Sequence, residues 1–156
     1  MIKNKFAVLI AVIIFIQDVQ ALQFDVVGAC HSGSVFSTAV KIPDEKKISL
    51  GDLTVKMFVE NEIPFRGSAQ GISQIYDSPV GDQALEVLSS AQMRAYGWCV
   101  HVDDNEPSEM PDQVIITSIV KKVTWFYAYS FYDEGVWKDY CTASWKEHSL
   151  AYCKKR

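Results

Sequence analysis

The sequence predicts an α+β fold in which a mixed β-sheet packs on one short helix. Leu53 to Glu60 alternates apolar and polar residues with a period of two, which is typical of a half-buried strand. Val80 to Ala91 instead repeats apolar residues at helical spacing. Lys122 to Tyr132 is apolar on both faces, which indicates a strand inside a sheet.

The N-terminus predicts an export signal. Two lysines precede an apolar run of eleven residues, Phe6 to Ile16, and the small-residue site Val19-Gln20-Ala21 follows. We expect cleavage after Ala21, so that residues 1–21 form a signal peptide and the mature chain is exported, either to a periplasm or as a secreted protein. A retained membrane anchor is a weaker alternative, because the apolar run is too short to span about 30 Å of hydrocarbon. A lipid attached at Cys30 is weaker again, because acidic residues separate this cysteine from the run.

Length and charge limit the organisation and the partners of the mature chain. Of the 156 residues, 135 remain after cleavage, which is the size of one ordinary domain. The formal net charge is −4 for the whole chain and −5 for the mature part. Nucleic acids and anionic membranes select basic surfaces, so this charge argues against both. No stable membrane anchor is expected once the signal peptide is removed.

We expect three parts in the mature chain. Residues 22–50 form an N-terminal extension, which the charged, proline-containing segment Pro43 to Lys47 separates from the main domain. Residues 51–132 form that domain. Residues 133–156 form a C-terminal tail held by a disulfide.

Within the main domain, strands precede the predicted helix. The strand at Leu53 to Glu60 is followed by an irregular second strand within Ile63 to Tyr76, which Pro64 and two glycines interrupt. Ser78 as N-cap and Pro79 at the first helical position then predict a short helix that ends near Gln92.

A hairpin closes the domain. Ala95 to Val102 forms one strand, the acidic loop Asp103 to Asp112 follows, and a short strand at Gln113 to Thr117 precedes the aromatic strand Lys122 to Tyr132. Side chains of the first strand alternate, so Tyr96 and Trp98 face one side and Cys99 and His101 the other. We expect the Tyr96 side to pack under the helix. Two strands, a helix and further strands that close a mixed sheet describe a β-grasp-like arrangement.

Four cysteines remain after cleavage: Cys30, Cys99, Cys141 and Cys153. An even number in an exported chain predicts two disulfides. Of the three possible connectivities we favour Cys141 with Cys153, which closes a short loop, and Cys30 with Cys99. The alternative is a metal site formed by Cys30-His31 and Cys99-x-His101, although structural zinc sites usually have other spacings.

Three segments carry a further pattern: Pro79 to Leu85, Tyr96-Gly97-Trp98 running on to Pro107, and the Trp-containing run Lys122 to Tyr127. They resemble the helix start, the aromatic-Gly-Trp strand and the closing strand of the transcobalamin-like C-terminal domain family, over roughly residues 53–132. The family turn usually holds Asn-Gly, so Asp103-Asp104-Asn105 predicts a longer or differently shaped turn here. The resemblance implies a β-grasp fold. It also implies packing against a corrin ring, as in the family's cobalamin carriers, although most members resemble exported modules of unknown ligand.

The aromatic residues predict a binding surface. One helix covers only one face of a sheet, so aromatic side chains on the other face would form a platform, although most of them belong in the core. The function that we predict is a non-catalytic binding module without cofactor or metal. Its partner would be a protein, a peptide, a glycan or a small ring ligand such as a corrinoid. The candidate ligand-binding residues are His101, Trp125, Tyr127, Tyr129 and Trp137.

A small secreted enzyme is the alternative from another class. Nucleophile-elbow, phosphate-loop and His-Glu-x-x-His motifs are absent from the sequence. Catalysis would therefore need an unpaired cysteine or a pair of carboxylates. The candidates are Cys99 with His101, His31 or His148 as base, and the pairs Asp103 with Asp112 and Asp133 with Glu134. The acidic loop could also supply oxygen ligands to calcium, but it lacks EF-hand spacing, and solvation explains it equally well.

Overall fold

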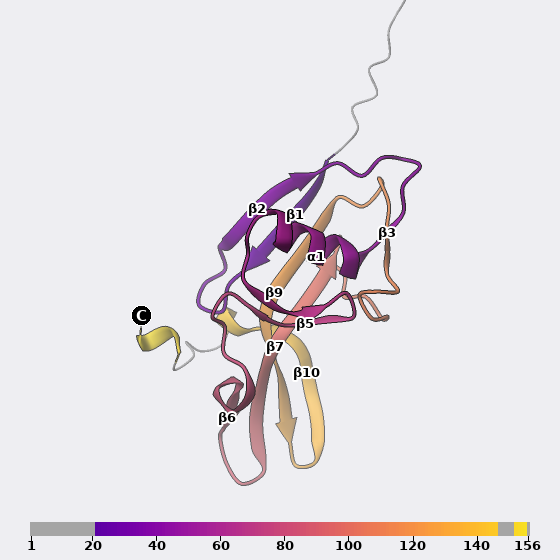
Figure 1. Cartoon of the computed structure of the whole chain (residues 1–156). Helices are drawn as coiled ribbons and strands as arrows, with labels where there is room; N and C mark the ends of the chain where they lie inside the picture. The colour runs from indigo at the N-terminus through magenta and orange to yellow at the C-terminus, as the bar shows by residue number, and fades with distance from the viewer. Residues whose placement is uncertain (1–20, 147–151, 156) are drawn as a thin grey trace, which may run out of the picture.

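The computed structural model describes residues 21–146 and 152–155, and the predicted signal peptide, apart from Ala21, lies outside this part of the chain. It shows a mixed sheet with one α-helix (Figure 1), which confirms the α+β class. The helix is α1 (Leu50–Glu60), and η1 (Gly81–Ala84), η2 (Ser144–Lys146) and η3 (Cys153–Lys155) are short 3-10 turns. The strands are β1 (Leu22–Val27), β2 (Ser34–Val40), β3 (Ile48–Ser49), β4 (Phe65–Ser68), β5 (Gly71–Ile75), β6 (Leu85–Val87), β7 (Gln92–Val102), β8 (Ile115–Ile116), β9 (Lys122–Asp133) and β10 (Val136–Ala143).

The main sheet has the strand order β2-β1-β9-β7-β6. β1 runs parallel to β9, whereas the other pairs of this sheet are antiparallel. β1 pairs with the first half of β9 and β10 with its second half. The predicted boundaries at residues 50 and 132 are therefore wrong, because the supposed N-terminal extension and C-terminal tail both supply strands to this one sheet.

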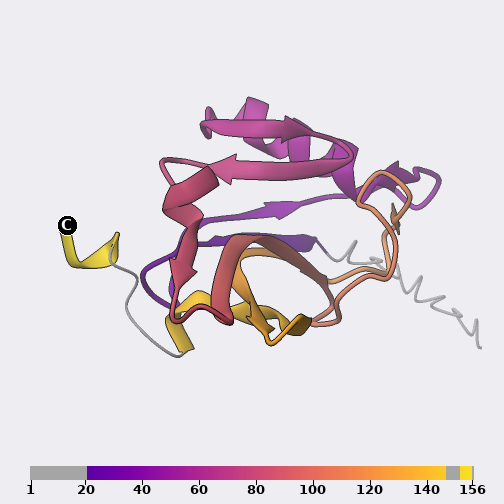
Figure 2. The same ribbon diagram turned by 90° about the horizontal axis from the view of Figure 1, so that it is seen from below.

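The main sheet separates two faces, which we call the helix face and the open face. α1 and the β4–β5 hairpin lie on one side of the sheet (Figure 2). The core forms between them and the helix face, and its members come from distant parts of the chain. They include Phe24 of β1, Phe58 of α1, Val100 of β7 and Trp125 of β9.

α1 occupies the segment that alternation assigned to a strand. Ser49 caps it: Ser49 Oγ accepts the Asp52 N–H at 3.0 Å and donates to the Asp52 carboxylate at 2.7 Å. The predicted strand at Leu53 to Glu60 is wrong because the same apolar residues also fit a helical period, and the cap selects the helix. Its buried residues are Leu50, Gly51, Leu53, Thr54, Met57 and Phe58.

The helix predicted after Ser78 is also wrong, since this segment holds only the turn η1 and the strand β6. Gly81 adopts a left-handed conformation with φ of 58°, which an α-helix cannot continue through. Ser78 and Pro79 have other partners. Ser78 Oγ accepts the Trp98 indole N–H at 2.9 Å, and the Pro79 carbonyl accepts the Tyr127 hydroxyl at 2.7 Å.

The turn after β7 is shorter than predicted. Val102 and Asn105 exchange two backbone hydrogen bonds, so Asp103 and Asp104 are the two central residues of a tight turn. Both have positive φ, 48° and 62°, which is the backbone shape that Asn-Gly adopts in tight hairpins. Aspartate tolerates this region better than most residues, which is how the chain makes the turn without glycine.

All four cysteines form disulfides, but the predicted pairing is wrong. The bonds join Cys30 to Cys153 and Cys99 to Cys141. Cys99 lies on β7 and Cys141 on β10, which both flank β9, so the sheet brings them together. Disulfides are typical of an oxidising compartment. In the described part of the chain, no helix is long and apolar enough to cross a membrane.

Candidate functional site

Three of the five predicted ligand-binding residues are in the core. Trp125, Tyr127 and Tyr129 are only 2, 0 and 5% exposed. The Trp125 indole donates to Thr54 of α1 at 2.9 Å, and the Tyr127 hydroxyl donates to the Pro79 carbonyl. Burial is the main cause that raises the pKa of Tyr127, which keeps this phenol neutral. These three side chains therefore do not form an exposed aromatic platform.

The other two predicted residues lie on the open face but far apart. His101 pairs with Thr124 of β9, and Trp137 of β10 pairs with Tyr132. Eight residues, or about 27 Å of extended strand, separate Thr124 from Tyr132. The Trp137 ring lies 5.3 Å from the ring of Tyr132. His101 and Trp137 consequently cannot belong to one small site.

His101 lines a cavity of about 370 Å³ on the open face. Its ring lies 4.5 Å from that of Phe126, and the ring of Trp145 in η2 meets the Phe126 ring edge-on at 6.2 Å. Val27 of β1 adds an apolar wall, and Lys146 brings a positive charge. Strands β1, β7, β9 and β10 and the turn η2 thus converge on one partly aromatic hollow.

A row of polar residues leads from this cavity across four neighbouring strands. Ser37 of β2 pairs with Asp25 of β1, Asp25 with Thr124 of β9, and Thr124 with His101 of β7. Paired residues of adjacent strands point to the same face, so these four side chains follow one line about 14 Å long. We call them the polar row. The Asp25 carboxylate accepts the Ser37 hydroxyl at 2.7 Å and the Gln23 amide at 2.9 Å, which fixes its orientation.

Thr124 occupies the centre of the polar row. Its Oγ1 is buried and has no hydrogen-bond partner among the described residues. A buried hydroxyl without a partner costs free energy, and native proteins contain few of them. The strand pairing places Thr124 between an acceptor, Asp25, and the imidazole of His101.

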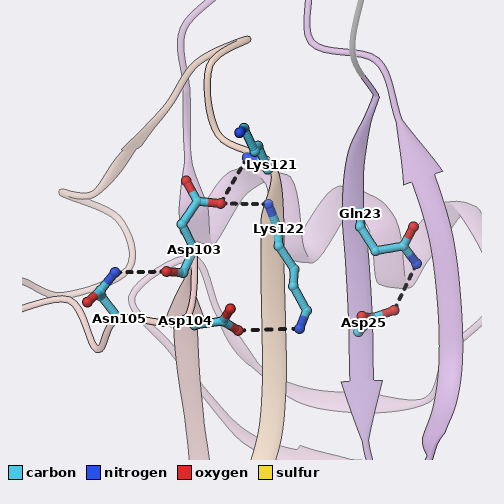
Figure 3. Close-up of polar contacts among 7 residues, drawn as sticks. All are labelled: Gln23, Asp25, Asp103, Asp104, Asn105, Lys121 and Lys122. Atoms are coloured by element: carbon cyan, nitrogen blue, oxygen red, sulfur yellow. Dashed lines mark hydrogen bonds and ion pairs between the residues drawn. The ribbon is translucent and has the colours of Figure 1, made fainter.

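A second polar group borders the row near the β7 turn (Figure 3). Lys122 is the register partner of Gln23, and its ammonium group reaches the Asp104 carboxylate at 3.3 Å. Asp103 Oδ1 accepts the backbone N–H groups of Lys121 and Lys122, both at 2.9 Å. In this view the α1 ribbon passes behind the strands, so Gln23, Asp25, Lys122 and Asp104 are seen from the side away from the helix.

Two carboxylates of the acidic loop have structural partners. Asp103 and Asp104 are engaged as described above, and the described residues contain no group of His, Cys, Asp or Glu side chains suited to a metal ion. The hydrogen bond from Lys138, and next the one from Gln92, lower the pKa of Asp133. A general acid needs a raised pKa, so Asp133 is poorly suited to that role.

The disulfides also remove the cysteine chemistry considered above. Each of the four sulfur atoms is bonded to another, so none is available as a thiolate nucleophile or as a ligand of a Cys–His metal site. His148, one of the possible bases, lies outside the described residues.

Comparisons with protein-family models, with curated proteins and with solved structures found no match.

Sequence reasoning found only His101 among the residues of the open-face site. It missed Asp25, Thr124 and Trp145. Asp25 carried a signal, because a single acidic residue inside an apolar strand must find partners. Its closeness to Thr124 depends on the parallel pairing of β1 with β9, and the strand order cannot be read from local periodicity.

Proposed function

We propose that this chain is an exported, non-catalytic binding module that holds the sugar rings of a glycan on the open face of its sheet. The observation that carries the proposal is the polar row, which runs from Ser37 to His101 and ends in the cavity walled by Phe126 and Trp145. Binding sites commonly combine an apolar hollow with a few fixed polar groups in this way.

The chemistry of a sugar ring suits these groups. One face of a pyranose is apolar and fits against an aromatic ring, and the half-buried Trp145 offers such a ring at the cavity wall. The hydroxyls around the ring both donate and accept. Asp25 accepts, whereas the hydroxyls of Ser37 and Thr124 do both, and His101 does either according to its tautomer.

The absence of catalysis is part of the proposal. The four cysteines are used in disulfides, and the Asp103 carboxylate of the acidic loop holds the turn through the Lys121 and Lys122 N–H groups. Asp25 is already engaged by Gln23 and Ser37, which suits a fixed hydrogen-bond acceptor better than a group that must exchange protons. Export is supported by the predicted signal peptide at residues 1–21 and by the two disulfides.

The strand order favours a β-grasp fold, and the resemblance to transcobalamin-like C-terminal domains over residues 53–132 stays a prediction. A β1–β2 hairpin, a helix and a later strand β9 inserted parallel to β1 make the mixed arrangement expected of a β-grasp fold. The two strands whose motifs carry the resemblance, β7 with Trp98 and β9 with Trp125, pair with each other in the sheet. The Pro79 to Leu85 segment adds no support, because it is not an α-helix. A corrinoid is therefore the second candidate ligand. A corrin ring with its side chains exceeds the cavity of about 370 Å³, so only one edge of it would enter.

A glycan array probed with the mature, disulfide-bonded chain tests the proposal, followed by calorimetry with the best ligand and with cobalamin. Trp145→Ala should weaken glycan binding at least tenfold. Trp137→Ala is the matched control, because it removes an aromatic residue of the open face remote from the cavity, and binding should stay within twofold. Asp25→Asn should also weaken binding.

Three results would contradict the proposal. The first is an array without saturable binding, and the second is equal loss of affinity in the Trp145 and Trp137 variants. The third is shortening of the bound glycan, detected by mass spectrometry, which would show catalysis. Binding of cobalamin alone, with a shifted visible spectrum, would favour the corrinoid instead.

A further inference from the structure

A second cavity, of about 350 Å³, lies on the helix face at the edge of the sheet. The loop after β1, the segment that follows β5, Trp98 of β7 and Tyr152 near the C-terminus meet there. The disulfide between Cys30 and Cys153 ties two of these segments together. This cavity is separate from the glycan site proposed above, because its Trp98 points to the opposite face from Cys99 and His101.

Three aromatic residues line this cavity: Tyr76, Trp98 and Tyr152. Trp98 is held on two sides. Its indole N–H donates to Ser78 Oγ at 2.9 Å, and its ring meets the ring of Tyr127 edge-on at 5.5 Å. Ser78 is itself buried, so this hydrogen bond is protected from water. The cavity therefore has a preformed indole wall.

Tyr76 lines the cavity at a cost in backbone free energy. Its φ is 53°, in the left-handed region that bulky residues rarely occupy. The Tyr76 N–H donates to the Pro64 carbonyl at 2.7 Å, which fixes this strained backbone. The side chain is 37% exposed, so burial of the ring in the core does not compensate for the strain. A strained aromatic residue kept at a cavity points to a role in binding.

The lining contains one acidic side chain and one imidazole. Asp77 and His31 are both wall residues, and no lysine or arginine occurs among the described lining residues. Burial raises the pKa of Tyr76 and of Tyr152, so both phenols are neutral near pH 7. Electron-rich aromatic rings beside a carboxylate attract cations, and aromatic cages of this composition recognise quaternary ammonium groups.

We propose that this cavity binds an organic cation of the alkylammonium class, with Tyr76, Trp98 and Tyr152 as the aromatic walls. The net negative charge of the chain favours the approach of such a ligand. The proposal does not rest on glycan binding at the open face, and either can fail without the other.

Choline and its uncharged isostere 3,3-dimethyl-1-butanol are the probes that separate a cation site from a merely apolar hollow. Binding to the full mature chain is followed by the indole N–H resonance of Trp98, which a Trp98→Phe variant assigns. Choline should bind saturably and at least tenfold more tightly than the alcohol. Equal binding of the two probes, or no saturation by choline, would overturn the proposal.

Variants localise the effect. Tyr76→Leu should weaken choline binding by about tenfold through loss of the ring, whereas Tyr76→Phe should stay within twofold. Tyr140→Leu is the matched control, because Tyr140 is an exposed tyrosine elsewhere on the chain. If Tyr76→Leu binds choline like the wild type, the cavity is not the binding site. Trp145→Ala should leave choline binding unchanged, which distinguishes this site from the open-face site.

Discussion

The hydrogen bond between Trp125 and Thr54 is a direct test of how α1 is held on the helix face. The Trp125 indole donates to Thr54 Oγ1 at 2.9 Å, and this hydroxyl donates in turn to the Leu50 carbonyl at 2.7 Å. Trp125 and Thr54 are 2 and 0% exposed, so water cannot replace a lost partner. Thr54→Val keeps the shape of the side chain and removes the hydroxyl that accepts the hydrogen bond from this indole.

The expected loss follows from the unpaired donor. A buried N–H left without a partner costs about 1–3 kcal/mol of unfolding free energy. The Leu50 carbonyl still has its helical N–H donor, so it adds little. Thr54→Ser keeps the hydroxyl and should cost only about 1 kcal/mol, for the lost methyl group. In a Trp125→Phe background the donor is absent, and Thr54→Val should then cost about 1–2 kcal/mol less than it does in the wild type.

Urea unfolding of the four proteins of this cycle measures the coupling between the two side chains. Far-UV circular dichroism is the appropriate probe, because the cycle removes a tryptophan. The slopes of unfolding free energy against urea should agree among the variants, so that midpoints compare stability directly. If Thr54→Val costs the same with and without Trp125, the hydrogen bond contributes nothing, and apolar packing alone holds α1.

Three further predictions concern a disulfide, the hairpin turn and alkaline pH. Replacing Cys99 and Cys141 by alanine removes a crosslink between residues 42 apart and should lower the unfolding free energy by about 4 kcal/mol in urea unfolding. Asp104→Gly should raise the unfolding free energy by about 0.5–1 kcal/mol, and with it the melting temperature, because φ is 62° at this position. A lower melting temperature than that of the wild type would mean that the lost ion pair with Lys122 outweighs the relief of backbone strain. Burial raises the pKa of Tyr127 in the folded chain above its value of about 10 in the unfolded chain. The neutral phenol therefore contributes fully to the unfolding free energy below about pH 10, and this contribution is lost as the pH rises further. Tyr127→Phe should therefore show a smaller fall in urea midpoint between about pH 9 and pH 11, and an equal fall would contradict this assignment.

Periodicity correctly predicted the strands whose pattern of apolar residues fits only one type of secondary structure. Lys122 to Tyr132 is too long and too evenly apolar for a surface element, and it is the central strand β9 (Lys122–Asp133). The hairpin partner β7 was predicted equally well. Leu53 to Glu60 failed because its apolar residues satisfy two periods at once. The signal that decides is outside the apolar pattern, in Ser49 and Asp52, which form the cap.

The cysteine pairing shows a different limit. Proximity in sequence favoured Cys141 with Cys153, since short loops close easily. In the sheet, however, β9 lies between β7 and β10, and their pairing with it places Cys99 close to Cys141. Cys153 then pairs with Cys30 across the fold. Connectivity is thus a consequence of strand order, and strand order depends on long-range pairing that no local pattern encodes.

The same dependence explains why aromatic residues predicted the wrong kind of site. A surplus of rings suggested a platform, but Trp125 and Tyr127 are buried on the helix face. The open face keeps a small apolar cluster around Phe126 and, beside it, the polar row. Once β1 is inserted parallel to β9, Asp25 must lie beside Thr124, and Thr124 is already opposite His101. The parallel pair therefore creates the polar row, and a change that shifted the register of β1 by one residue would turn Asp25 into the core and remove the site and the fold together.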